Sequence, residues 1–99
     1  MAFGISREEL KLWKQRVRKG EIAFLTHYWL DDRFPGCDTV TKDGWSDVEK
    51  LMSRGRKYGL SDHWIDYKTD YPHYDLFGEY QREILRQEQI WDQIERFKI

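Results

Sequence analysis

The sequence has few of the residues that staple small extracellular folds or span membranes. It contains one cysteine, Cys37, and two prolines in 99 residues, so an internal disulfide is excluded, and a disulfide scaffold with it. No apolar run approaches the roughly 20 residues that cross a bilayer, and residues 1–9 become charged before an apolar leader could form. We therefore expect a cytoplasmic protein with no membrane partner.

Charged and aromatic side chains are abundant instead. Charged residues make up 35% of the chain, hydrophobic residues 39% and aromatic residues 16%, and the net charge is −1. This composition is typical of a globular chain whose core is built largely from rings. The length suits one domain, and no internal repeat or Pro/Gly-rich linker interrupts it. We expect residues 1–99 to form a single domain.

Capping signals and hydrophobic spacing predict a helix and then a strand in the first half of the chain. Ser6 and Glu9 form a capping box that opens a helix, which Gly20 ends. The nearly continuous apolar run of residues 21–30 predicts a strand that is buried on both faces and central in its sheet. Residues 39–41 would form a short edge strand within the long loop that follows.

The second half of the chain also predicts a helix and then a strand, followed by a last helix. Ser46 and Glu49 predict a capping box for a second helix, and Gly59 is placed to end that helix in a Schellman motif. Residues 64–67 alternate weakly, as a short strand would, and a last helix begins near residue 77 or 78 and runs almost to the end. The predicted order is α-β-α-β-α. It indicates an α+β or α/β domain with a short sheet covered by helices.

Two segments combine ionisable side chains with aromatic residues and a proline, and both lie in acidic stretches of the chain. These are residues 30–35, with Asp31, Asp32 and Arg33, and residues 72–76, with His73, Tyr74 and Asp75. Like charges gathered in one cleft are costly unless a positive group lies among them. If the two segments share a cleft, we therefore expect a positive group in it, which would be Arg33, a bound cation or a basic partner.

The succession of motifs resembles a known family. The matching stretches are residues 31–35, 51–60, 64–65 and 72–76. They follow the Asp-Asp-Ala-Arg, Leu-Gly-Leu, Trp-Phe-Gln and His-Tyr-Asp-Leu/Val motifs of short uncharacterised bacterial and phage proteins, and the whole chain is similar to the YneQ-like family. The resemblance covers about residues 30–86 and implies no activity. Tyr80-Gln81 stand where that pattern has Lys-Arg, which argues against phosphate binding.

His73 and the nearby carboxylates are candidates for a metal centre. Imidazole nitrogen and carboxylate oxygen suit Zn²⁺, Mn²⁺ or Fe²⁺, so Asp31, Asp32 and His73 are candidate ligands of a divalent metal, with His27 as a further one. The buried strand before the aspartates would carry them to a sheet edge where crevices form. We therefore predict that Asp31 or Asp32 shares a cleft with His73 and Asp75. The alternative is a structural hydrogen-bonded cluster.

The same side chains also permit acid–base catalysis without a metal. His73 would act as the base, with Asp32 and Asp75 as the other candidate catalytic residues, and Arg33 would bind an anionic substrate. A hydrolytic reaction fits these groups. No serine or cysteine nucleophile is recognisable beside them.

Aromatic residues flank both motifs and suggest a binding site for a small ligand. Tyr74, Trp64 and Trp45 could form an aromatic cup that works together with Arg33. Packing of these rings in the core is the alternative explanation.

An interaction module without chemistry is the other class of function that the sequence permits. Leu85, Ile90 and Phe97 lie off the apolar stripe of the last helix, which suggests self-association as a homodimer. The first two helices carry basic faces, but the pI near 6.3 and the acidic loops argue against a nucleic-acid partner.

Overall fold

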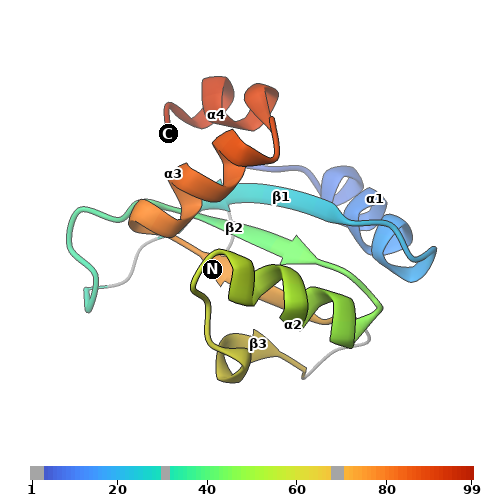
Figure 1. Cartoon of the computed structure of the whole chain (residues 1–99). Coiled ribbons are helices and arrows are strands. Elements are labelled where there is room, and N and C mark those ends of the chain that lie inside the picture. The colour runs from blue at the N-terminus through green and yellow to red at the C-terminus, as the bar shows by residue number, and fades with distance from the viewer. Residues whose placement is uncertain (1–3, 30–31, 68–70) are drawn as a thin grey trace.

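The computed structural model describes residues 4–29, 32–67 and 71–99, and it is an α+β domain, as predicted (Figure 1). None of the helices in these ranges is both long and apolar enough to cross a membrane. The elements, in chain order, are α1 (Arg7–Arg18), β1 (Ala23–Tyr28), β2 (Thr39–Gly44), α2 (Val48–Lys57), the 3₁₀ turn η1 (Asp62–Trp64), β3 (Ile65–Asp66), β4 (His73–Leu76), α3 (Gly78–Gln87) and α4 (Trp91–Phe97).

The strands form one antiparallel sheet in the order β1-β2-β4-β3. The prediction that the first strand is central is therefore wrong, because β1 lies at an edge and β2 lies inside the sheet. The apolar run was read correctly as burial on both faces: α1 packs on one face of β1 and α4 on the other. Sequence periodicity reports the burial of a strand and not its place in the sheet. β4, which joins β2 to β3, was not predicted.

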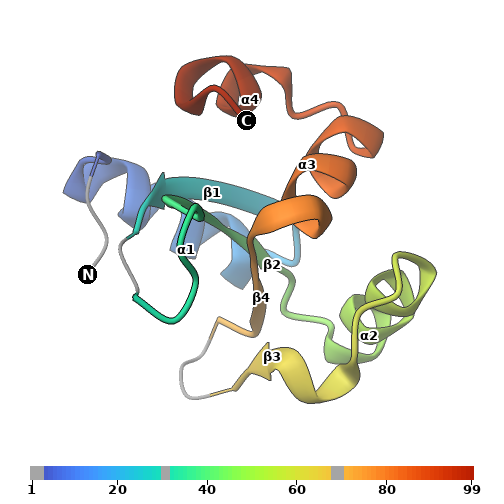
Figure 2. The same ribbon diagram turned by 90° about the vertical axis from the view of Figure 1, so that its left-hand side faces the viewer.

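The helices cover the two faces of the sheet unequally. α1 packs on one face, while α2, α3 and α4 pack on the other, which Figure 2 shows edge-on. The larger core lies between the sheet, α2 and α3. Its buried members are Leu51, Leu60, Ile65, Tyr74, Leu76 and Ile84. The smaller core consists of Trp13 and Val17 of α1 against Ala23 and Leu25 of β1.

The helix ends confirm most of the predicted capping signals. Ser6 Oγ accepts from the backbone N–H of Glu9 at 3.1 Å, so the capping box opens α1 as predicted. Gly59 has a φ of +82° and ends α2 in a Schellman motif. Ser46 does not cap α2. Asp47 does, because its carboxylate accepts from the N–H of Lys50 at 3.1 Å and its negative charge suits a helix N-terminus.

The predicted last helix is two helices. Gln89 adopts a φ of +59° and the N–H of Ile90 bonds to the carbonyl of Leu85 at 2.9 Å, a Schellman stop without glycine. α4 then folds back over β1, where the rings of Phe97 and Tyr28 lie 5.0 Å apart. Leu85 and Phe97 are buried inside the chain. Their positions off the stripe are therefore explained without a partner subunit.

Candidate metal centre and neighbouring pocket

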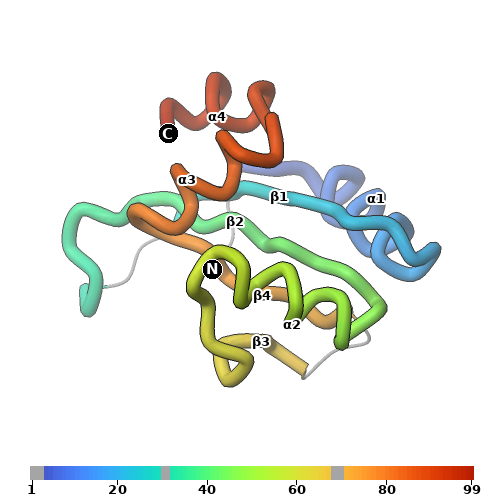
Figure 3. Tube along the Cα trace, in the orientation of Figure 1, coloured from blue at the N-terminus to red at the C-terminus, as the bar shows by residue number. Residues whose placement is uncertain are grey.

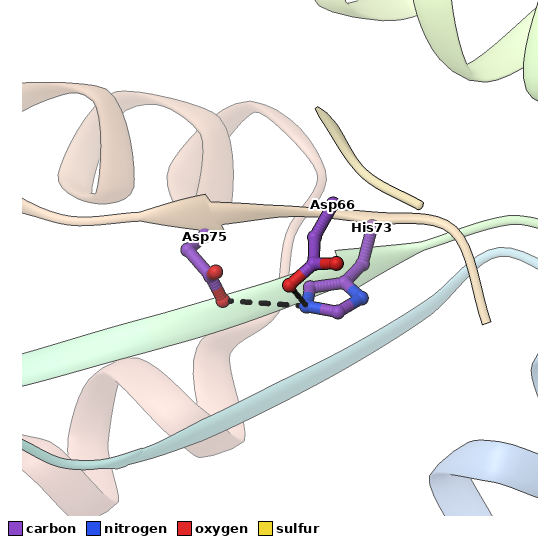
Figure 4. Close-up of side chains that lie close together, drawn as sticks. All are labelled: Asp66, His73 and Asp75. Carbon is purple, nitrogen blue, oxygen red and sulfur yellow. Dashed lines mark ion pairs between the residues drawn. The ribbon is translucent and has the colours of Figure 1, made fainter. Parts of the chain in front are cut away.

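The pairing of β3 with β4 brings three ionisable side chains together. Asp66 lies opposite His73 in the register, and Asp75 follows His73 by two residues, so all three point to the α1 face of the sheet. His73 Nε2 lies 3.8 Å from Asp66 Oδ2 and 3.6 Å from Asp75 Oδ1 (Figure 4). One ligand atom from each residue falls within 4.8 Å of the others. This spacing allows one cation to contact all three.

His73 is held so that one ring nitrogen faces the carboxylates. The residue is 4% exposed, and the ring lies edge-on to Trp13 at 5.5 Å between centroids. Nδ1 lies 2.7 Å from the carbonyl oxygen of Tyr71, which can only accept, so Nδ1 carries the proton. Nε2 then faces the carboxylates of Asp66 and Asp75. It is buried and has no hydrogen-bond partner among the described residues.

The carboxylates connect this buried nitrogen to solvent. The Asp66 side chain is 33% exposed and that of Asp75 is 45% exposed, so an ion could enter from their side. Lys42 on β2 places its Nζ 3.7 Å from Asp75 Oδ1 and is the local counter-charge. Ligands at about 2.1 Å from a tetrahedral ion lie roughly 3.4 Å apart, close to the separations seen here. The two distances from His73 Nε2 to the carboxylates are therefore slightly longer than those between ligands of a small divalent ion.

The other predicted ligands lie elsewhere or outside the described residues. Asp31 is outside them. Asp32 is exposed in the loop after β1, beside the Tyr28–Thr39 pair, whereas His73 pairs with Gly44 at the other end of β2. Five residue steps along a strand separate those ends by about 16 Å, and Figure 3 shows the loop and the start of β4 at opposite ends of the sheet. The structure does not bring Asp32 to His73.

The prediction rested on a rule for parallel sheets, in which the carboxyl ends of strands meet at one edge. This sheet is antiparallel, so that rule does not apply. His27 is buried on β1 with its Nδ1 2.9 Å from the carbonyl oxygen of Tyr28, and burial lowers the pKa of its imidazole. It is not part of the group. Asp66 was missed as a member of this group, although a hairpin between residues 65–66 and 73–74 would have placed it opposite His73.

Three of the four predicted ligand-binding residues line one pocket. Arg33, Trp64 and Tyr74 border a hollow of about 630 Å³ beside β4. Trp45 does not border it: its indole N–H donates to the carbonyl of Gly20 at 3.1 Å, and its ring lies under the Arg54 guanidinium. The ring of Trp45 is thus used in packing, which was the alternative explanation for these aromatic residues.

A buried ionic cluster on the opposite face was not predicted. Asp43 of β2 is 3% exposed and accepts from Arg54 of α2, which also pairs with Glu88 at 3.2 Å. Burial raises the pKa of the Asp43 carboxyl to about 6, against the opposing effect of Arg54. Because Arg54 also lies over the ring of Phe24, the cluster fastens α2 and the end of α3 to the sheet. We assign it a structural role.

The sequence comparisons give one informative relative. No family model matches the chain, and no solved structure matches it either. The chain is 58% identical to the "Uncharacterized protein YneQ" of Bacillus subtilis (strain 168), over the whole length of both chains. The name of that relative assigns no activity. The chain belongs to the YneQ family.

Proposed function

We propose that this domain binds a divalent transition-metal ion through Asp66, His73 and Asp75. The observation that carries the proposal is the Nε2 atom of His73, which is buried, lacks a hydrogen-bond partner among the described residues and faces two carboxylates. A buried polar atom left without a partner costs about 1–3 kcal/mol. A metal ion would offset that cost and the repulsion between the carboxylates.

The ligand set also fits what such ions prefer. One imidazole and two carboxylates suit Zn²⁺, Mn²⁺ and Fe²⁺ better than Ca²⁺, which takes six to eight oxygen ligands. The Tyr71 carbonyl that accepts from His73 Nδ1 is the kind of outer partner that orients metal-bound histidines. This partner fixes the tautomer that leaves Nε2 available as a ligand.

The chemistry of such a centre would be hydrolytic. Three protein ligands leave coordination positions for water, and a bound divalent ion can lower the pKa of that water toward 7. The carboxylates are partly exposed, so a substrate could reach those positions. In this proposal His73 and Asp75 serve the reaction as ligands, and neither acts as a free base.

The competing explanation is a structural ion cluster without a metal. A protonated His73 would pair with both carboxylates at the observed separations, and Lys42 would complete the charge balance. In that case divalent ions would not bind to the three residues and would not stabilise the native state. Thermal unfolding separates the two explanations, because a ligand of the native state raises the melting temperature.

The test is a melting curve of the chelator-stripped protein with Zn²⁺, Mn²⁺ or Ca²⁺. An ion at about 100 times its Kd adds about 2.7 kcal/mol, which is about 10 °C or more for a domain of this size. We expect this shift with Zn²⁺ or Mn²⁺ and little with Ca²⁺. It should disappear in Asp66→Asn, His73→Gln and Asp75→Asn.

The matched control is His63→Ala, which removes an exposed histidine of η1. It should keep the full shift, because that imidazole is not part of the group. If the shift persists in His73→Gln but disappears in His63→Ala, the ion binds a surface histidine and the proposal is wrong. If no ion shifts the curve of the wild-type protein, the structural cluster is the correct explanation.

A further inference from the structure

One flank of α1 carries a row of positive charges, which we call the basic row. Its members are spaced four, three and four residues apart, so they lie on one side of the helix: Arg7, Lys11, Lys14 and Arg18. None of them pairs with a carboxylate of the described residues, whereas Lys42, Arg54 and Arg56 each do. The pI near 6.3 is an average over the whole chain and does not report this local excess of positive charge.

The basic row lies on the side of α1 that faces the candidate metal centre. Lys14 Nζ and the Arg18 guanidinium lie 5.5 and 5.2 Å from the centroid of the Tyr71 ring. The carbonyl of Tyr71 accepts from His73 Nδ1, and the ring of Trp13 on α1 packs against that of His73. One end of the basic row is therefore a single residue away from a candidate metal ligand.

The length of the basic row fits a polymeric anion. Arg7 and Arg18 are the first and last residues of α1, a helix of 12 residues, so they lie about 16 Å apart along its axis. A small anion would meet one or two of these cations. A nucleic-acid strand presents about five phosphates over that length. Evenly spaced phosphates can therefore engage the whole row.

The apolar side of α1 is already used inside the fold. Trp13 and Val17 are buried against the sheet. Leu12 is exposed, but it is not three or four residues from any member of the basic row, so it lies on another side of the helix. A helix that binds a membrane surface needs apolar side chains beside its cations. The basic row therefore suits an anion in water better than a lipid surface.

We propose that the basic row binds the phosphodiester backbone of a nucleic-acid strand, without regard to sequence, and leads it across the candidate metal centre. The substrate of that centre is then a phosphodiester, a part of the inference that rests on the proposed function. In the reaction, water adds to phosphorus, the bond from phosphorus to one sugar oxygen breaks, and a proton of the water passes to that oxygen. The products are a phosphate monoester end and a free hydroxyl end.

The binding test measures the fluorescence anisotropy of a labelled oligothymidylate of about 12 nucleotides, titrated with the full chain in EDTA. Four phosphate contacts predict a slope of about −3 for log affinity against log salt concentration, which is about a 50-fold loss between about 50 and 200 mM salt. The double variant Arg7→Gln/Lys11→Gln should halve this slope. Both residues are exposed, so the variant should keep the far-ultraviolet circular dichroism of the wild type.

The matched control is the double variant Lys57→Gln/Arg86→Gln. It removes the same amount of charge from exposed positions of α2 and α3. The control should keep the full slope, because these residues do not belong to the basic row. A loss of slope in both double variants would show that binding follows net charge alone, and the proposed surface would be wrong.

The cleavage test replaces EDTA with Zn²⁺ or Mn²⁺ and separates the products on a denaturing gel. We expect cleavage by the wild type and none by His73→Gln, although this variant should bind the strand in EDTA as tightly as the wild type. Because binding is measured without divalent ions, failure of the metal proposal would leave the binding result unchanged.

Three other results would overturn the inference. A slope near zero for the wild type would show that the basic row makes no phosphate contacts. Tighter binding to phosphatidylserine vesicles than to the oligonucleotide would assign the row to a membrane surface. A strand that binds and stays intact, while melting curves show that the ion is bound, would show that a phosphodiester is not the substrate.

Discussion

Replacing Asp43 with asparagine should remove a specific pH dependence from the stability of this domain. Asp43 lies between the sheet and α2, where it accepts from Arg54. Its residue is 3% exposed, and burial raises the pKa of the carboxyl from 3.8 to about 6. Asparagine keeps the size of the side chain but cannot titrate. The variant therefore isolates the contribution of this one proton.

The sign follows from proton linkage. The folded-state pKa of Asp43 is above the unfolded one, so the native state binds the proton more tightly. The stabilisation from this proton is fully present below about pH 3.8 and is lost as the pH rises through about 6. A pKa difference of about 2 corresponds to about 3 kcal/mol. About 1.4 kcal/mol of that should be lost between about pH 5 and pH 7.5.

The assay is urea unfolding of the wild type and Asp43→Asn across this pH range. The difference between their free energies of unfolding should change by about 1.4 kcal/mol, with the wild type losing stability relative to the variant toward higher pH. A constant offset is also expected, because the variant leaves Arg54 with Glu88 as its remaining acidic partner. A difference that does not vary with pH would refute the reasoning, since Asp43 would then be ionised throughout.

Three further predictions concern the helix ends and the candidate metal centre. Ser6→Ala and Asp47→Ala each remove a helix cap and should each lower the free energy of unfolding by about 1 kcal/mol. Ser46→Ala should change it by less than about 0.5 kcal/mol. Urea unfolding measures all three variants. Gln89→Gly should raise it by about 0.5 to 1 kcal/mol, because glycine adopts the positive φ without strain. Lys42→Met should tighten Zn²⁺ binding about threefold in calorimetric titration, since it removes an ammonium that competes for Asp75.

Local signals in the sequence predicted two of the helix ends, although they placed the cap of α2 at Ser46 and not at Asp47. The capping box at Ser6 and the glycine stop at Gly59 depend on residues three to five apart in the chain, and the structure contains both. The break at Gln89 depends on a positive φ, as the one at Gly59 does. A glutamine in the sequence does not predict a positive φ, whereas a glycine does. The break is stabilised by contacts between α4 and β1, which the local sequence does not predict. One of these contacts is a hydrogen bond from Gln93 Nε2 to the carbonyl of Phe24 at 2.8 Å.

The sheet and the candidate site depend on pairings that periodicity does not encode. β3 and β4 are two and four residues long, too short for alternation to show which strand neighbours which. His73 was recognised from its polar and aromatic setting. Its partner Asp66 could be found only from the antiparallel register, and the distance of Asp32 only from the sheet order.

The burial of His73 also bears on the spacing between its ring and the carboxylates of Asp66 and Asp75. A purely structural cluster would gain most if a carboxylate accepted from Nε2–H at the usual 2.7–2.9 Å. Here both carboxylates remain 3.6 and 3.8 Å away, while Nδ1 uses the proton for the Tyr71 carbonyl. Three donor atoms are thus placed around a common point without satisfying one another. In the metal proposal, a cation at that point would satisfy His73 Nε2 and offset the repulsion between the two carboxylates.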